Sequence, residues 1–436
     1  MQTLLSPEFK GTADGDAAQD IIRKCVHCGF CNATCPTFQL LGDELDGPRG
    51  RIYLIKQVLE GAQVTRSTQQ HLDRCLTCLN CQTTCPSGVQ YGHLVDIGRK
   101  IVDARVERPV KERTLRWVLR EGLTSALFAP AMRLGQALRP LLPPGLKNKV
   151  PARLAGVAGP TTVPPTAAPA RAAHRHQILM LGGCVQPCMM PNIDLAAARV
   201  LDAAGIGIVY AAGAGCCGSL RTHLGDHEGG LADMRRNIDA WMPMVAAGEV
   251  QAIVSSASAC SLAIKEYGYA LSGDAEYADK AARISGLARD LCELLPQLVP
   301  ALKDKMRHGA RARLALHPPC TLQHGQKLRG AIEPHLEALG FDVRVASSES
   351  HLCCGSAGTY SITQPEIART LRDRKLSHLA ALGPQIIVSA NVGCIQHLQS
   401  GTDTRVMHWI EALDAALMPR IAHGMPREAP LPPRGA

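Results

Sequence analysis

Two cysteine runs, CVHCGFCNATCP at Cys25–Pro36 and CLTCLNCQTTCP at Cys75–Pro86, share the spacing C-x2-C-x2-C-x3-C-P. This spacing is typical of ferredoxin-type chains with two [4Fe–4S] clusters, in which the fourth cysteine of each run ligates the cluster of the other run. The runs therefore predict two clusters with exchanged fourth ligands. The predicted ligands are Cys25, Cys28, Cys31 and Cys85 for one cluster, and Cys75, Cys78, Cys81 and Cys35 for the second.

A structural zinc site and a disulfide framework are the alternatives for these cysteines. Zinc takes four ligands, usually from two Cys-x2-Cys pairs, whereas each run here offers four cysteines and ends in Cys-Pro. Disulfides persist in oxidising compartments, and the N-terminal MQTLLSPEFKGTADGD lacks a basic segment followed by an apolar one. We therefore favour the clusters and expect a cytoplasmic protein.

Length and charge indicate how the rest of the chain is divided. With 436 residues, 46% hydrophobic and 3% aromatic, the chain has room for about three domains with small aliphatic cores. Arg99–Lys149 holds 12 basic and 4 acidic side chains, most of the net charge of +9, and its spacing predicts basic amphipathic helices. These helices either pack as a connector or dock on a membrane surface or an acidic partner. No nucleic-acid motif accompanies them.

The second half of the chain contains an internal repeat. ILMLGGC and ARLALHPPC are each followed by CCG and then by a lone cysteine, with corresponding cysteines 134–137 residues apart. Short aliphatic runs alternate with helix-like segments in each unit, which predicts parallel sheets flanked by helices. The expected strands are 178–183, 206–212 and 251–257 in the first unit, and 312–317, 341–348 and 384–390 in the second.

These observations predict an α+β multidomain chain. A mostly helical ferredoxin-type domain with two [4Fe–4S] clusters is followed by two tandem α/β CCG repeats. The predicted segments are 1–110 for the ferredoxin-type domain, 111–177 for a basic helical connector and proline-rich linker, 178–310 and 311–420 for the two repeats, and 421–436 for a flexible tail.

The first CCG also lies in GAGCCG, Gly213–Gly218, which matches the G-x-G-x-x-G pattern of dinucleotide sites. The second repeat reads SESHLCCG and lacks the preceding glycines, so we do not favour a nucleotide site. Gly218 and Gly355 are instead predicted to allow a turn that points two sulfurs at one centre.

Two ferredoxin-type runs followed by two Cys…CCG…Cys units resemble the CCG family, the iron–sulfur subunits of flavin-linked dehydrogenases and heterodisulfide reductases. LSPEFKGT, RKCVHCGFCNATCPTFQLLGDELDGPRGRIYLIKQVLEG and HLDRCLTCLNCQTTCPSGVQYGHLVDIGR are similar to bacterial glycolate oxidase iron–sulfur subunits in particular. The resemblance implies an FAD-containing partner that oxidises glycolate to glyoxylate, and a second flavin-type subunit. Electrons would leave through this chain to an acceptor other than oxygen, a membrane quinone, at the cytoplasmic face of the inner membrane.

This division of labour predicts an electron-transfer subunit with no catalytic residue, since nothing in the chain resembles a flavin-binding domain. Two other functions fit the same architecture: an iron–sulfur subunit for glycerol-3-phosphate or lactate oxidation, and a disulfide reductase that uses a CCG-bound cluster. A zinc-bound scaffold is the non-enzymatic alternative. His27, Arg49 and Arg51 either tune cluster potentials or are solvated loop residues.

The CCG units depart from the fuller family pattern. There the last cysteine belongs to a C-x2-C pair, and such five-cysteine sites in heterodisulfide reductases hold noncubane clusters, whereas Ala257 and Asn391 replace the earlier cysteine here. The remaining thiols can bind a further cluster or metal, form a redox pair, or pack as apolar side chains. They are Cys184, Cys216, Cys217 and Cys260, and Cys320, Cys353, Cys354 and Cys394. Weaker candidates are Cys188, Cys292, His317 and His351, of which Cys292 is expected in the core.

Overall fold

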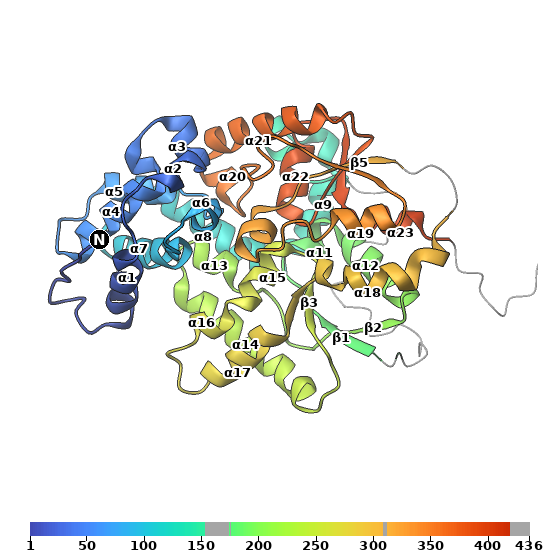
Figure 1. The fold of residues 1–436 in the computed structure, drawn as a ribbon, viewed down its shortest axis with the longest axis horizontal. Helices are drawn as coiled ribbons and strands as arrows, with labels where there is room; N and C mark the ends of the chain where they lie inside the picture. Colours follow the sequence, from blue (N-terminus) through green and yellow to red (C-terminus); the bar gives the residue numbers. More distant parts are fainter. Residues whose placement is uncertain (153–173, 175, 308–311, 419–436) are drawn as a thin grey trace, which may run out of the picture.

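Residues 1–152, 174, 176–307 and 312–418 are described by the computed structural model of the chain (Figure 1). They form a helical N-terminal part and two α/β units, each built on a four-stranded parallel sheet. The predicted α+β multidomain class is therefore confirmed. The predicted tail at 421–436 and most of the proline-rich linker lie outside the described residues, and the predicted domain boundaries stay predictions.

The N-terminal part is helical because capping residues stand at the starts of its helices. Thr12 accepts a hydrogen bond from the Gly15 amide at 3.1 Å and caps α1, while Pro36 and Pro48 open two further helices at a position that needs no N–H. Residues 1–110, all described, contain no strand. The elements are α1 (Ala13–Arg23), α2 (Phe30–Ala33), α3 (Pro36–Leu41), η1 (Glu44–Asp46), α4 (Pro48–Leu59), α5 (Arg66–Asp73), α6 (Asn80–Thr84) and α7 (Tyr91–Arg105).

The two sheets have the same strand order, as expected for a repeated unit. Every neighbouring pair is parallel, and the six predicted strands are confirmed. The order is β2 (Ile206–Val209), β1 (His176–Met180), β3 (Ile253–Ser255), β4 (Ala288–Asp290) in the first sheet, and β6 (Asp342–Val345), β5 (Arg313–Leu316), β7 (Ile386–Ser389), β8 (Arg405–His408) in the second. β4 and β8 are additional strands that lack a long aliphatic run.

Helices connect the strands and cover the sheets, so the carboxyl ends of the strands are free to carry side chains for a site. The connector to the first unit contains α8 (Val110–Thr124), α9 (Phe128–Ala137), η2 (Arg139–Leu141) and α10 (Pro144–Lys147). The first unit contains α11 (Gln186–Met189), α12 (Pro191–Ala203), α13 (Ser219–His223), α14 (His227–Ala246), α15 (Ser258–Lys265), α16 (Tyr267–Ala270), α17 (Ala278–Leu287), η3 (Leu291–Leu294), α18 (Leu295–Leu302) and η4 (Lys303–Lys305). The second contains η5 (Thr321–Gly325), α19 (Glu333–Ala338), α20 (Tyr360–Thr363), α21 (Pro365–Ala380), α22 (Val392–Gln399) and α23 (Trp409–Ala416).

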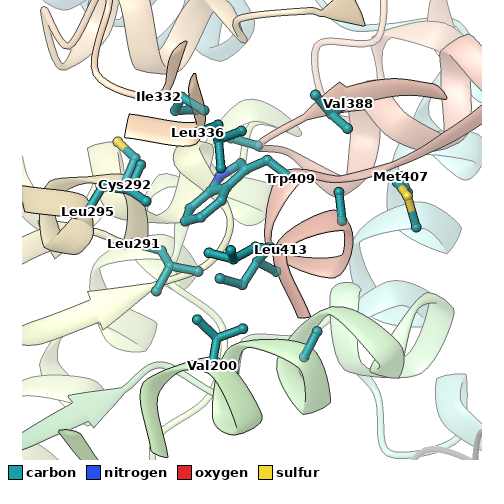
Figure 2. Packing of buried hydrophobic residues seen from close by; sticks show 14 of the residues in the cluster. Val200, Leu291, Cys292, Leu295, Ile332, Leu336, Val388, Met407, Trp409 and Leu413 are labelled. Carbon is teal, nitrogen blue, oxygen red and sulfur yellow. The ribbon is translucent and has the colours of Figure 1, made fainter. Parts of the chain in front are cut away.

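The two α/β units share one hydrophobic core. Figure 2 shows Trp409 of α23 surrounded by side chains from both units, among them Val200 of α12 and Leu336 of α19. Trp409 and Val200 are both 0% exposed. A polar contact spans the same interface, where His408 Nε2 lies 2.9 Å from the Ser256 carbonyl oxygen. The repeats are therefore packed into a single body.

The helical N-terminal part contacts both units. His93 of α7 stacks on Tyr269 of the first unit, with ring centroids 3.6 Å apart at 7°. Tyr360 of the second unit donates from its hydroxyl to the Arg74 carbonyl oxygen at 2.8 Å. A small apolar cluster continues this second contact and includes Leu76, Cys320, Cys353, Tyr360, Ala368 and Leu371, with Cys78 packed against it.

Candidate iron–sulfur sites

Five thiols from the two cysteine runs line a first cavity in the N-terminal part. α1 ends just before the first of them, and α6 just before the last. The cavity is also lined by Ile52 of α4, by Val89, which precedes α7, and by Tyr91, the first residue of α7. It opens at the exposed Cys28, beside the exposed side chains of Val26 and Phe30. The thiols of this first set are Cys25, Cys28, Cys31 and Cys85, and Cys81 also touches the cavity.

A second cavity adjoins the first, and its thiols are buried except for the half-buried Cys78. Pro48 and Arg51 of α4 line it, and Pro48, Cys81 and Tyr91 line both cavities. The thiols of this second set are Cys35, Cys75, Cys78 and Cys81. The first set thus includes Cys85 of the second run, and the second set includes Cys35 of the first run. The assignment of these thiols as cluster ligands stays a prediction.

The two runs share an unusual backbone conformation that curls each one around its cavity. His27 and Thr77 occupy equivalent positions in the runs and have φ values of 60° and 52°. Two residues further on, Gly29 and Leu79 have φ values of 86° and 61°. Left-handed conformations are costly for residues other than glycine and persist where the surrounding structure enforces them. One consequence is visible at Thr77, whose amide donates to Cys75 Sγ at 3.4 Å.

Two arginines supply positive charge to the second set. Burial alone would raise the pKa of Cys75, but the nearby guanidinium groups of Arg51 and Arg99 hold it below its ordinary value. Arg51 is 1% exposed, and its Nε donates to the His71 carbonyl oxygen at 2.7 Å. Arg99 donates to the Cys75 carbonyl oxygen at 2.6 Å. Arg51 is therefore a buried cation beside the cavity, and its alternative interpretation as a solvated loop residue is wrong.

Arg49 lies beside the first set in a more exposed position. A Cβ atom on Gly29 would lie 2.7 Å from Arg49 Nη1, so the guanidinium passes directly over the loop of the first run. Its Nε donates to Glu44 Oε1 at 2.5 Å. That hydrogen bond raises the pKa of Arg49, and the charges of Cys31 and Cys28 act in the same direction.

The spacing of these thiols fits a group larger than a single ion. Among the described residues, two groups of three donor atoms lie within 4.8 Å of one another, and neither group includes a thiol of these two sets. Thiols that are gathered around a cavity but spread this widely suit [4Fe–4S] clusters, which such runs bind through four cysteines. A cluster bound in either cavity would supply one-electron redox chemistry.

The CCG cysteines also come together in each α/β unit. Cys184 Sγ lies 3.5 Å from Cys216 Sγ, and this contact together with burial raises the pKa of Cys184. Cys217 contacts both Cys216 and Cys260. In the second unit the same order of contacts runs through Cys320, Cys353, Cys354 and Cys394.

The glycine after each cysteine pair adopts a left-handed turn. Gly218 has a φ of 91° and Gly355 a φ of 87°. A Cβ atom at Gly355 would lie 2.4 Å from the Ala368 carbonyl oxygen, so the turn needs glycine for both conformation and space. Four thiols per unit are thereby brought within reach of a metal or cluster.

The weaker candidates differ in their positions. Cys188 lies next to the first CCG site, where its Sγ donates to the Cys184 carbonyl oxygen at 3.3 Å. Cys292 is 1% exposed in η3 and packs in the shared core, which confirms its predicted role. His351 accepts from His324 Nε2 through its carbonyl oxygen at 2.8 Å. His317 lies with Cys354 and Cys394 at the second CCG site.

Comparisons with known families agree with this arrangement. Residues 21–89 match the family model described as a 4Fe-4S dicluster domain, and residues 178–265 and 314–399 match the model described as a cysteine-rich domain. The chain is therefore an iron–sulfur protein with two [4Fe–4S] clusters and a duplicated cysteine-rich unit.

More particularly, the chain belongs to the family of glycolate oxidase iron–sulfur subunits. It is 52% identical to the glycolate oxidase iron-sulfur subunit of Escherichia coli (strain K12), over 96% of this chain and 99% of the relative. It is 28% identical to the probable glycolate oxidase iron-sulfur subunit of Bacillus subtilis (strain 168), over 91% of each chain. Lactate utilization protein A of Bacillus subtilis (strain 168) is 21% identical and covers 53% of this chain.

Proposed function

We propose that the chain is the electron-transfer subunit of a glycolate dehydrogenase complex. An FAD-containing partner oxidises glycolate to glyoxylate, and the electrons leave through the two clusters of this chain to an acceptor other than oxygen, a membrane quinone. The observation that carries this proposal is the pair of adjoining cysteine-lined cavities, considered with the 52% identity to a glycolate oxidase iron-sulfur subunit. The first set of thiols binds one cluster and the second set binds the other.

The residues around the two sets would keep the clusters close together and partly protected from water. Pro48, Cys81 and Tyr91 line both cavities and form the boundary between them. Tyr91 is 3% exposed and its hydroxyl donates to Cys75 Sγ at 3.7 Å. Hydrogen bonds to sulfur and burial are two of the properties that set cluster potentials, so Tyr91 and Arg51 contribute to the potential of the second cluster.

The flavin-containing partner docks at the opening of the first cavity. Cys28 is exposed there, and its neighbours Val26 and Phe30 are 69% and 62% exposed. The second cavity, in contrast, is covered on the side of Cys78 by the second repeat. Apolar side chains around the more accessible redox centre suit a protein partner that must approach it closely.

The basic connector provides a surface for the membrane that holds the quinone. Several apolar side chains of α8 to α10 are exposed, including Trp117 at 55%, Leu127 at 75% and Leu141 at 82%. They accompany the basic side chains of Arg99–Lys149 that lie beyond α7, and basic, apolar helices bind anionic lipid surfaces. Throughout the described ranges, no helix is both long and apolar enough to cross a bilayer. A second flavin-type subunit completes the proposed complex.

The test uses the complex purified with its flavin partner. A Cys28→Ser variant should keep glycolate oxidation with a dye that accepts electrons directly from the flavin, but lose quinone reduction. Unchanged quinone reduction would refute the proposed route. A Phe30→Glu variant should weaken partner binding at least tenfold, and Leu141→Glu is its matched control because that exposed leucine lies on the connector.

Leu141→Glu also tests the membrane surface. It should reduce co-sedimentation with anionic phospholipid vesicles, whereas Phe30→Glu should not. Equal sedimentation of Leu141→Glu and the wild-type protein would contradict the proposed lipid contact.

Lactate and glycerol-3-phosphate are alternative substrates of the flavin partner. The likeness to lactate utilization protein A, which covers 53% of this chain, favours testing lactate first. A panel of glycolate, lactate and glycerol-3-phosphate, oxidised by the same purified complex, separates these functions.

A further inference from the structure

One group of side chains in the second α/β unit has the geometry of a binding site for a single metal ion. His317 follows β5, Cys354 belongs to the CCG turn, and Cys394 lies in α22. One ring nitrogen of His317 and the two sulfurs all lie within 4.8 Å of one another. Three segments that are far apart in the sequence therefore direct ligand atoms to one point at the carboxyl edge of the sheet.

His317 provides an independent sign that this point binds a ligand. The side chain is 1% exposed, and neither ring nitrogen has a hydrogen-bond partner. Buried polar groups are nearly always hydrogen-bonded, because an unpaired one costs free energy. A neutral imidazole binds a metal through the lone pair of one ring nitrogen, and no hydrogen bond occupies either nitrogen of His317.

The close spacing favours one ion over a cluster at this position. Sulfurs bound tetrahedrally to zinc at the usual Zn–S distance lie about 3.8 Å apart. A [4Fe–4S] cluster inserts iron and sulfide between its ligands and separates them further, as in the two cysteine sets of the N-terminal part. We propose that the second CCG unit binds one zinc ion through His317, Cys354, Cys394 and, in the fourth position, Cys353, which contacts Cys354.

A positive charge next to the site suits the proposed zinc ion and its four ligands. Three thiolates, a neutral imidazole and Zn²⁺ carry a net charge of −1. The ammonium group of Lys375, 3% exposed, can offset that charge, because Cys320, Cys354 and Cys353 all interact with it electrostatically. Its Nζ is held in place by the carbonyl oxygens of Glu349 and, at 3.4 Å, Ser350.

The first CCG unit lacks both the buried histidine and the buried lysine, so it serves as an internal control. Leu181 stands three residues before Cys184, as His317 stands three residues before Cys320. α14, the second helix after the first CCG turn, carries the buried polar side chains of Asp233 and Asn237. Asn237 donates from Nδ2 to the Cys216 carbonyl oxygen at 2.7 Å. A neutral amide and a leucine thus stand where the second unit has a cation and an imidazole.

The position of the ion gives it a structural role. Cys353 and Cys320 pack with Leu76 in the apolar cluster that also contacts Cys78 of the second set. Zinc does not change its oxidation state. The ion would therefore fix the CCG turn next to the second cluster without accepting electrons from it.

The experiment compares metal content in the full chain purified anaerobically with its clusters. Wild-type protein should contain one zinc per chain, and X-ray absorption at the zinc edge should show one nitrogen and three sulfur ligands. Cys394→Ser should lower zinc content at least tenfold, and its equivalent in the first unit, Cys260→Ser, should not. His317→Gln should release zinc to a chelator at least tenfold faster than wild type.

Several results would overturn the proposal. These are wild-type protein without zinc, a zinc edge with four sulfurs and no nitrogen, or a loss of iron in place of zinc in Cys394→Ser. The cluster EPR signals and the thermal midpoint report whether each variant is folded. If His317→Gln does not fold, the absorption spectrum of Co²⁺-exchanged wild-type protein decides, since a tetrahedral thiolate site gives visible bands and their absence contradicts the assignment.

Discussion

The carboxylate of Asp46 lies 3.4 Å from the guanidinium group of Arg51, and each side chain is 1% exposed. Asp46 also accepts from Arg74 at 2.8 Å and lies 3.0 Å from His71 Nδ1. This network stands directly beside the second cysteine set, because Arg51 lines that cavity. Replacing Asp46 by asparagine leaves the Arg51 charge buried without its counter-ion.

We expect Asp46→Asn to destabilise the N-terminal part by about 3–5 kcal/mol, the usual result of breaking a buried ion pair. The second cluster should be lost at a lower temperature than the first, as followed by EPR during thermal unfolding. Asp20→Asn is the control, because its pair with Arg23 is 73% and 61% exposed and should contribute under about 1 kcal/mol. Equal midpoints for the two variants would contradict this expectation.

The turn after the second cysteine pair should be intolerant of a side chain. In Gly355→Ala the new Cβ meets the Ala368 carbonyl oxygen at 2.4 Å, in addition to the cost of a left-handed φ. Gly330→Ala has a similar φ of 78° but no atom within 4 Å. The control should therefore cost about 1–2 kcal/mol, and Gly355→Ala clearly more, in denaturant unfolding. An equal loss of unfolding free energy in the two variants would mean that the close approach of the Ala368 carbonyl oxygen is unimportant.

The shared core makes Trp409 important for both α/β units. Trp409→Ala should destabilise the chain by about 3–5 kcal/mol, the typical cost of removing a buried tryptophan. Because the side chain is 0% exposed between the two units, both should unfold in one transition at a lower temperature. Trp117→Ala, at a side chain 55% exposed, should leave the midpoint nearly unchanged. If Trp409→Ala lowered the stability of the second unit alone, the two units would be shown to unfold independently.

Acid should weaken the contact between the two units through His408. Burial lowers the pKa of this histidine to about 3 from 6.5, because the charged imidazolium is disfavoured. The neutral form stabilises the fold above pH 6.5, and this contribution is lost as the pH falls from 6.5 towards 3. At pH 5 the loss amounts to about 2 kcal/mol.

A His408→Asn variant removes this titration while keeping a side chain able to cap α23. Its stability should fall less than that of the wild type between pH 7.5 and pH 5, as measured by urea unfolding. His176→Gln, at an exposed histidine, serves as the control. An unchanged pH dependence in His408→Asn would assign the acid sensitivity to other groups.

The features that could be predicted from the sequence are those that depend on the spacing of residues close together in the chain. Aliphatic runs bounded by glycines predicted six strands, and the CCG and lone cysteines predicted the repeat, because both signals lie within a few residues. β4 could not be predicted, since its sequence Ala-Arg-Asp resembles a loop and becomes a strand only beside β3. The common core escaped prediction for a similar reason, because Trp409 meets Val200 only after both units have folded.

In the candidate sites too, contacts between residues close in the sequence could be predicted, and contacts between distant residues could not. The spacing predicted that the first three cysteines of each run lie together, and they line one cavity in each case. The proximity of His317 to two cysteines could not be predicted with equal strength, because Cys354 and Cys394 come from other parts of the chain. One signal was available in the sequence: aligning the repeats sets His317 opposite Leu181, an unusual exchange of an aliphatic side chain for a metal-binding one.

The hydrogen bond from Tyr360 to the Arg74 carbonyl oxygen joins residues 286 positions apart. The first cavity is lined entirely by residues 25–91, so a nascent chain can enclose that cluster soon after its first hundred residues leave the ribosome. Cys78 gains its apolar cover only when Tyr360 and Leu371 have been synthesised. The N-terminal part can therefore form both cavities early in biosynthesis, because residues 35–91 also line the second one. The apolar cover over Cys78 is the part that waits until translation is nearly complete.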